Sequence, residues 1–163
     1  MASAPSPAAC FDDAPLAAQD VARGVTRLFF RQDLFALCEV PLPNGRRADM
    51  MAIDAKGQMT IVEIKVSRAD LMGDGKWTDY LDYCDRFFWA VPAGFALEPF
   101  ETEAFAPDCC GLIVADRYDA AVVREAPVRQ LSPARRKAET LRFARRAALR
   151  LTGTLDPGLA GLD

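Results

Sequence analysis

The sequence contains no histidine, and none of its five cysteines has C-x-x-C spacing. A zinc site built from cysteine and histidine ligands is therefore not expected. Reduced thiols that pack as small apolar side chains are the ordinary interpretation in a reducing cytoplasm, where disulfides are rare. This interpretation applies to all five residues: Cys10, Cys38, Cys84, Cys109 and Cys110.

Long apolar runs are absent as well, and no stretch has the length and hydropathy of a membrane span. Residues 1–9 have neither the basic start nor the apolar run of a signal peptide, so we expect a plain tail there. These absences predict a cytoplasmic protein with no membrane partner.

With 163 residues, of which 51% are hydrophobic, the chain is long enough for one domain with an adequate core. We expect the domain over residues 14–152, between a tail at 1–13 and a loose C-terminal tail at 153–163. The net charge of −3 gives no overall reason to expect a nucleic-acid ligand. One segment near the C-terminus is nevertheless strongly basic, because its seven basic residues are accompanied by a single acid, Glu139. The basic residues are Arg135, Arg136, Lys137, Arg142, Arg145, Arg146 and Arg150.

An amphipathic helix is predicted at the start of the domain. Asp12 and Asp13 precede Pro15, which suits a helix cap followed by a first-turn proline. Apolar residues then recur at helical spacing to about Phe30, so this helix should cover one face of a sheet. Its polar side carries arginines at four-residue intervals, interpreted as a solvated face with phosphate contact as the alternative: Arg23, Arg27 and Arg31.

Three strands are predicted next, over Leu34–Leu42, Arg46–Asp54 and Gln58–Val66. Each connection has three residues and ends in glycine, at Gly45 and Gly57. Such loops are typical of hairpins in which a type I turn is followed by a left-handed residue.

The register set by these loops brings acidic side chains together. Glu39 should lie opposite Asp49, and Asp49 opposite Glu63. Lys65 should point to the same side as Glu63, because side chains two residues apart in a strand share a face. The next rows on this face are apolar: Leu37, Met51 and Ile61, then Phe35, Ile53 and Met59.

The row of carboxylates indicates a divalent-cation site. Like charges directly opposite each other destabilise a sheet, and a bound cation would remove that repulsion. Oxygen ligands without histidine suit Mg²⁺ or Mn²⁺. The alternative is that these acids are solvated rim residues paired with Arg47 and Lys65.

The following segments are expected to complete a mixed sheet. Ser67 can cap a short helix, and two glycines then separate it from a second helix over Lys76–Tyr83. A strand buried on both faces follows at Arg86–Val91, and the helical crossover predicts that it runs parallel to its partner. An irregular connection and a final hairpin around residues 116–119 come next.

A long helix capped by Ser132 should run to about Leu151, with Gly153 ending it. Its predicted apolar stripe consists of Ala134, Ala138, Leu141, Ala148 and Leu151. A basic stripe on the same helix is a candidate for phosphate contact: Arg135, Arg142, Arg146 and Arg150.

The order of helix, meander with Asp49 and Glu63-x-Lys65, helix and strand resembles the PD-(D/E)XK nuclease superfamily, although Ala48 stands where its signature has proline. Roughly residues 15–152 are similar to the MmcB family of bacterial DNA repair proteins. The matching stretches are Glu39–Asp49, Ile61–Asp70, Gly73–Pro92, Gly111–Asp116 and the segment that begins at Ala134.

The resemblance implies a restriction-endonuclease-like α/β (α+β) fold, with a mixed central sheet, helices on both faces and a C-terminal basic helix. It also implies a nucleoid-associated DNA repair protein with metal ligands at Asp49 and Glu63 and a catalytic lysine at Lys65. Glu39 as a further metal ligand rests on the predicted register, and Asp20 of the first helix is the alternative source of that acid.

Three functions stay open at the level of sequence. The first is a Mg²⁺- or Mn²⁺-dependent DNA endonuclease with little base specificity, and its DNA-contacting candidates are Arg47, Lys76, Arg135, Arg142, Arg146 and Arg150. The second is a non-cleaving module that binds DNA or other repair proteins, and the third is a purely structural interaction protein. A homodimer through an exposed sheet edge, or through Trp77 and Tyr80, is a further option, although such aromatic residues are more often core.

Overall fold

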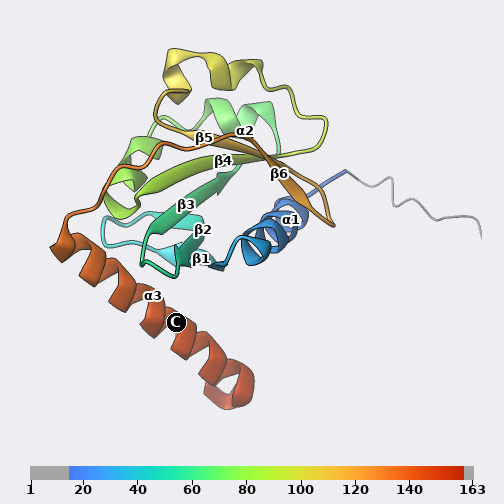
Figure 1. Cartoon of the computed structure of the whole chain (residues 1–163). Coiled ribbons are helices and arrows are strands. Elements are labelled where there is room, and N and C mark those ends of the chain that lie inside the picture. Colours follow the sequence, from blue (N-terminus) through green and yellow to red (C-terminus); the bar gives the residue numbers. More distant parts are fainter. Residues whose placement is uncertain (1–14, 160–163) are drawn as a thin grey trace, which may run out of the picture.

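The computed structural model describes residues 15–159 and has one six-stranded mixed sheet, in which the strand order follows the chain (Figure 1). The strands are β1 (Leu34–Pro41), β2 (Arg47–Asp54), β3 (Met59–Ile64), β4 (Arg86–Pro92), β5 (Gly111–Ala115) and β6 (Ala120–Arg124). The helices are α1 (Ala18–Arg31), α2 (Arg68–Met72) and α3 (Pro133–Leu155), with 3₁₀ turns η1 (Trp77–Tyr83), η2 (Glu98–Glu101), η3 (Glu103–Phe105) and η4 (Pro157–Leu159). The predicted α/β fold is confirmed.

The three-strand meander forms as its loops predict. Gly45 and Gly57 have φ values of 80° and 76°, in the left-handed region that glycine adopts without a steric penalty. The antiparallel pairs are those expected, for example Leu37 with Met51 and Met51 with Ile61. The turn glycines therefore fix which side chains of β1, β2 and β3 share a face.

The rest of the sheet also follows the prediction. The crossover through α2 and η1 brings β4 parallel to β3, β5 is parallel to β4, and β6 returns antiparallel to β5. Ser67 caps α2 by accepting a hydrogen bond from the Asp70 N–H at 3.1 Å. The segment predicted as a second helix is the 3₁₀ turn η1 rather than an α-helix.

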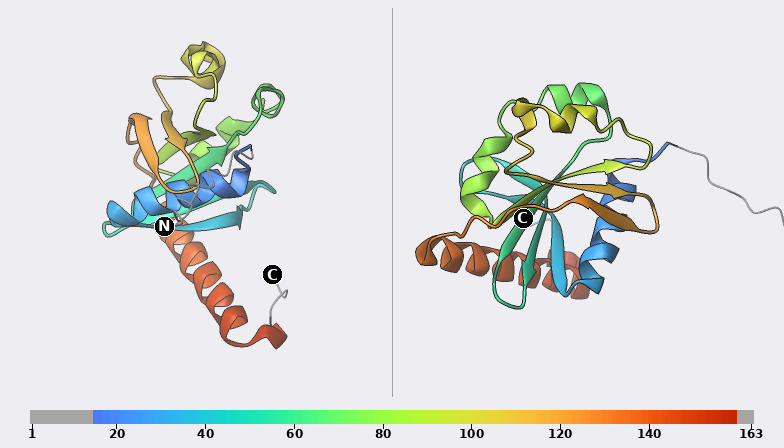
Figure 2. Two further views of the ribbon diagram at one scale, coloured as in Figure 1. Left: turned by 90° about the vertical axis from the view of Figure 1, so that its right-hand side faces the viewer. Right: turned by 45° about the horizontal axis from the view of Figure 1, so that its top comes forward.

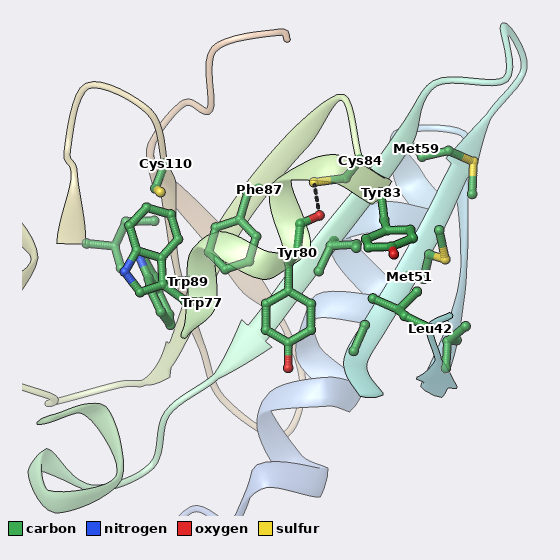
Figure 3. Packing of buried hydrophobic residues seen from close by; sticks show 14 of the residues in the cluster. Leu42, Met51, Met59, Trp77, Tyr80, Tyr83, Cys84, Phe87, Trp89 and Cys110 are labelled. Carbon is green, nitrogen blue, oxygen red and sulfur yellow. Dashed lines mark hydrogen bonds between the residues drawn. The ribbon is translucent and has the colours of Figure 1, made fainter. Parts of the chain in front are cut away.

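Each face of the sheet is covered by its own layer (Figure 2). On one face, Val21, Val25 and Phe29 of α1 pack against the sheet. On the other, η1, β4, η2 and η3 contribute an aromatic cluster that consists of Trp77, Tyr80, Phe87, Trp89, Phe100 and Phe105. Figure 3 labels Trp77, Tyr80, Phe87 and Trp89 of this cluster. The expectation that Trp77 and Tyr80 belong to the core is confirmed, so neither offers an exposed surface to a dimer partner.

One residue predicted for this core is exposed. Phe35 keeps 52% of its surface accessible and makes an edge-on contact with Phe30, with ring centroids 5.9 Å apart. Phe35 lies near the start of β1, which is an edge strand of the sheet.

Helix α1 begins later than predicted. Its first residue is Ala18, and the Asp20 carboxylate accepts a hydrogen bond from the Ala17 N–H at 2.9 Å. Asp20 thus satisfies one of the free N–H groups at the helix start, and Pro15 precedes the helix. The capping role predicted for Asp12 or Asp13, like the whole tail 1–13, concerns residues outside the described range.

Helix α3 runs beneath the meander in Figure 1 and continues further than predicted. Ser132 caps it as expected, accepting a hydrogen bond from the Arg135 N–H at 3.2 Å. The helix passes through Gly153 to Leu155, so the predicted end at Gly153 is wrong. Neither α3 nor any other helix within residues 15–159 is both long and apolar enough to cross a membrane.

The buried side of α3 differs from the predicted one. Its buried residues are Glu139, with no exposed surface, and Phe143. The carboxylate of Glu139 pairs with Arg142 at 2.9 Å and with Arg135 at 3.6 Å, so these arginines turn toward the domain. The residues of the predicted apolar stripe are exposed: Ala134, Ala138, Leu141, Ala148 and Leu151.

Candidate functional site

Strands β2 and β3 separate at the acidic residues. Their ladder ends at the pair Met50–Val62, next to Asp49 and Glu63. Beyond it, Asp49 Oδ2 accepts a hydrogen bond from the Ile64 N–H at 2.8 Å, and Glu63 Oε1 accepts one from the Asp49 N–H at 3.2 Å. Bonds between side chain and backbone thus replace the ladder and hold the two carboxylates next to each other.

A cleft of about 540 Å³ opens over this pair, and we refer to it as the acidic cleft. Its polar side chains come from the start of β2 and the residue before it, the end of β3 and the residue after it, α2 and the segment that follows it, and η1. They are Arg46, Arg47, Asp49, Glu63, Lys65, Asp70, Asp74 and Tyr80. Four carboxylates and one lysine therefore share one concave surface.

The protonation of Glu63 is strongly perturbed by its surroundings. Glu63 is only 4% exposed, and burial followed by the negative charge of Asp49 raises its pKa from 4.5 to about 8. Burial also raises the pKa of Asp49, against the hydrogen bond from Ile64 and the charge of Lys65. Burial and proximity make it unfavourable for both carboxyl groups to be ionised, and a bound divalent cation would stabilise their ionised forms.

Lys65 places its ammonium group among the acids. Its Nζ atom lies 2.8 Å from Asp74 Oδ2, 3.8 Å from Asp70 Oδ1 and 3.9 Å from Glu63 Oε2. Burial acts to lower the pKa of Lys65, but the hydrogen bond and charge of Asp74, with the other acids, outweigh it and the pKa is raised. Lys65 is therefore a buried cation held in a fixed position.

Tyr80 connects the aromatic core with the acidic cleft. Its ring packs against Phe87, while its hydroxyl points away from the other labelled rings in Figure 3 and donates to the Arg47 carbonyl at 3.2 Å. Burial, and then the charge of Glu63, raises the pKa of this phenol. Tyr80 is thus a protonated hydrogen-bond donor in the cleft wall.

Glu39 does not project with the other carboxylates as the register predicts. It has a φ of 54° and is skipped in the ladder between β1 and β2. Its Oε2 lies 2.6 Å from Arg47 Nε, and its carbonyl accepts a hydrogen bond from Arg150 Nη2 at 2.9 Å. The alternation of β1 shifts at this residue, because Val40 and Leu42 lie in the same core cluster as the aromatic rings.

The donor set suits a cation held by two carboxylates. Within residues 15–159, no group of three or more acidic or cysteine side chains is arranged to hold a metal ion. Mg²⁺ commonly takes only one or two carboxylates and completes its shell with water and substrate phosphates. Asp49 and Glu63 meet this requirement, and the roles of Glu39 and of the metal itself stay predictions.

Two of the predicted DNA-contacting residues lie at or near the acidic cleft. Arg47 lines it, and its guanidinium pairs with Glu39. Lys76 is exposed just beyond it, and its N–H donates to Asp74 Oδ1 at 3.4 Å.

The predicted arginines of α3 lie elsewhere, since none of the described residues that line the acidic cleft comes from α3. Arg135 stacks over the Tyr83 ring at 4.8 Å, and Arg142 and Arg150 have the partners given above. Arg146 lines a separate groove of about 690 Å³ between α3 and the end of β1. The basic stripe is thus partly used to attach α3 to the domain.

Sequence reasoning missed Asp70 and Asp74 as members of the site. Both follow the Glu63-x-Lys65 signature closely, and Asp74 lies between Gly73 and Gly75. The available signal was that Asp74 stands between two glycines, because such a flexible segment allows an acid to fold back toward Lys65.

Sequence reasoning also missed Asp85, a buried acid that holds β3, β4 and α3 together. Its carboxylate accepts hydrogen bonds from the Met59 N–H at 2.8 Å and the Leu131 N–H at 3.0 Å. The guanidinium of Arg136 adds two more, at 2.8 and 2.5 Å. Arg136, counted above within a basic surface, is therefore a structural residue.

Comparison with known proteins assigns the chain to a family. The family model described as "DNA repair protein MmcB-like" matches residues 8–158. Among solved structures, the chain is similar to the SPO1766 protein of unknown function from Silicibacter pomeroyi, with 41% sequence identity and a TM-score of 0.80. That match covers 93% of this chain and 98% of the other. A search of curated proteins found no match.

Proposed function

Because the chain belongs to the MmcB-like family of DNA repair proteins, we propose that it is a Mg²⁺-dependent nuclease that hydrolyses phosphodiester bonds of DNA. One observation carries the proposal: Asp49, Glu63 and Lys65 meet in a single cleft, with two carboxylates in contact through the backbone and a buried ammonium beside them. A fold that needed these residues only for stability would have little reason to bury like charges together.

The two carboxylates would hold the cation. Asp49 Oδ2 and Glu63 Oε1 are already oriented by backbone N–H groups, which leaves their remaining oxygen lone pairs for a metal. The cation would supply Lewis acidity toward the phosphate and a more acidic bound water. Glu63 would lose its proton when a cation binds, because metal ligation requires the ionised carboxylate.

Lys65 would act on the phosphate directly. Its ammonium is kept charged by Asp74 and held within 3.9 Å of Glu63. At that position it can hydrogen-bond the attacking water or offset negative charge that develops on the phosphate oxygens. Asp74 would hold the lysine in place.

The basic residues would bind the DNA backbone rather than read bases. Arg47 lines the acidic cleft and Lys76 lies at its edge, so both can contact phosphates that flank the scissile one. Arg145 and Arg146 line the separate groove between α3 and the end of β1 and offer a second area of positive charge. A DNA substrate would place the protein at the nucleoid.

A second candidate function is a non-cleaving module that binds DNA or a repair partner. The observation that favours it is the exposed side of α3, where Leu141 is 59%, Leu151 60% and Leu155 78% exposed. Apolar side chains exposed together on one helix are typical of protein interaction surfaces. On this alternative the acidic cleft would serve stability alone.

A cleavage assay distinguishes these functions. Single-stranded, branched and damaged DNA would be incubated with the protein and Mg²⁺ or Mn²⁺, beside Lys65→Ala and Asp49→Ala. We expect metal-dependent cleavage of at least one substrate and its loss in both variants, with Arg31→Ala as an active control outside the cleft. Salt-sensitive DNA binding without cleavage of any substrate would support the binding module.

A further inference from the structure

A second hollow adjoins the acidic cleft on the side of α1. This groove, called here the α1 groove, has a volume of about 690 Å³ and lies between α1 and the strands β1, β2 and β3. It shares Ala18, Asp49 and Ile64 with the acidic cleft. An extended ligand, such as a DNA strand, that passed across Asp49 would therefore lead from one hollow into the other.

The rim of the α1 groove is basic. Arg23 and Arg27 line it one helical turn apart, and both are exposed. Arg27 uses Nη1 to donate to the Tyr118 carbonyl at 3.0 Å, whereas within residues 15–159 no hydrogen bond or ion pair engages the side chain of Arg23. Glu39 on the opposite wall pairs with Arg47, so the two arginines outnumber Asp49, the remaining acid among the residues that line the groove.

The floor of the α1 groove is mostly apolar. Ala18, Ala22, Cys38 and Ile64 contribute to the lining, with Gln19 and Thr26 as polar neighbours. Such a floor fits the face of a sugar or a base. In duplex DNA the base faces are stacked inside the helix, whereas an unpaired strand leaves them free to contact protein.

We propose that the α1 groove binds unpaired nucleotides next to the phosphate held in the acidic cleft, with Arg23 contacting a backbone phosphate and the apolar floor contacting a sugar or base. This inference rests on the proposed nuclease function, since the acidic cleft fixes where the strand starts. It assigns the substrate a class, namely DNA with a single-stranded segment at the site of cleavage. A flap, a gap or a frayed end would each supply such a segment.

Binding measurements without divalent ions test the inference separately from cleavage. The anisotropy of a labelled single-stranded oligonucleotide, and of a duplex of equal length, would be titrated with wild type, Arg23→Ala and Arg31→Ala. Arg31 is on the same helix but pairs with Asp119 and does not line the groove, so it controls for loss of one positive charge. Far-UV circular dichroism would verify that the variants are folded.

We expect Arg23→Ala to weaken single-strand binding about fivefold and to reduce the slope of log K against log salt by about 0.7, the value for one phosphate contact. Duplex binding and Arg31→Ala should stay near wild type. Cys38 offers a second measurement, because an oligonucleotide in the groove should slow its alkylation by maleimide while Cys109, outside the groove, reacts unchanged.

Equal losses in Arg23→Ala and Arg31→Ala, or Cys38 alkylated at the same rate with and without oligonucleotide, would overturn the inference. Cleavage in Mg²⁺ that persists with an unchanged KM in Arg23→Ala would overturn it while leaving the proposed nuclease function intact. Conversely, binding that depends on Arg23 in a protein that cleaves nothing would keep the groove and refute hydrolysis.

Discussion

Replacing Glu63 with glutamine should change how the stability of the protein depends on pH. Folding raises the pKa of Glu63 from 4.5 to about 8, so the folded protein favours the protonated carboxyl. The stability that this proton provides is complete below pH 4.5 and is lost as the pH rises through 8. Glutamine resembles the protonated form and does not titrate.

The size of the effect follows from the shift. One pKa unit corresponds to about 1.4 kcal/mol, so the free energy of unfolding should fall by about 1.4 kcal/mol per pH unit between pH 5 and 8. The whole change is roughly 4 kcal/mol, a large part of the stability of a domain of this size. Glu63→Gln should remove the part of this slope that Glu63 contributes and be more stable than wild type at pH 8, while Asp49, whose pKa is also raised, keeps its own dependence.

Urea denaturation followed by circular dichroism at pH 5, 6, 7 and 8 measures this dependence. A second series with Mg²⁺ adds the link to function, because a cation at Asp49 and Glu63 competes with the proton. Mg²⁺ should stabilise wild type increasingly as the pH rises toward 8 and have little effect on Glu63→Gln. Parallel pH profiles for the two proteins, with or without Mg²⁺, would refute this account of the buried carboxylates.

Two further substitutions test how the site is supported. Asp85→Asn should cost about 3 kcal/mol in urea denaturation, because it removes the buried anion that pairs with the partly exposed guanidinium of Arg136. The loss should shrink when Arg136 is replaced by methionine as well. Gly24→Ala should cost about 2 kcal/mol or lower the yield of folded protein, because a Cβ there would lie 2.4 Å from the carbonyl oxygen of Asp116. An unchanged melting temperature would contradict the close packing of α1 on the β5–β6 turn.

Much of the fold could be predicted from local sequence signals. The loops ending in Gly45 and Gly57 determined the turn type, and the turn type determined the register that brings Asp49 to Glu63. The helical crossover likewise predicted the parallel pairing of β3 and β4. These features depend on a few neighbouring residues, so the sequence shows them directly.

Features that depend on distant contacts could not be read in this way. The left-handed backbone of Glu39 coincides with a hydrogen bond from Arg150, which is 111 residues away. The orientation of α3 depends on Glu139 being buried between arginines, against the ordinary rule that apolar residues face the core. Asp74 reaches Lys65 only because the chain folds back after α2.

A manganese-soaked crystal with anomalous data tests the central claim most directly, because Mn²⁺ substitutes for Mg²⁺ and is located by its own signal. The account predicts one anomalous peak within coordinating distance of the carboxylates of Asp49 and Glu63, with Lys65 beside it. The distance from that peak to Glu39 would decide whether this residue is a third ligand. A map without a peak at saturating Mn²⁺, or with a peak only outside the acidic cleft, would contradict the proposed metal centre.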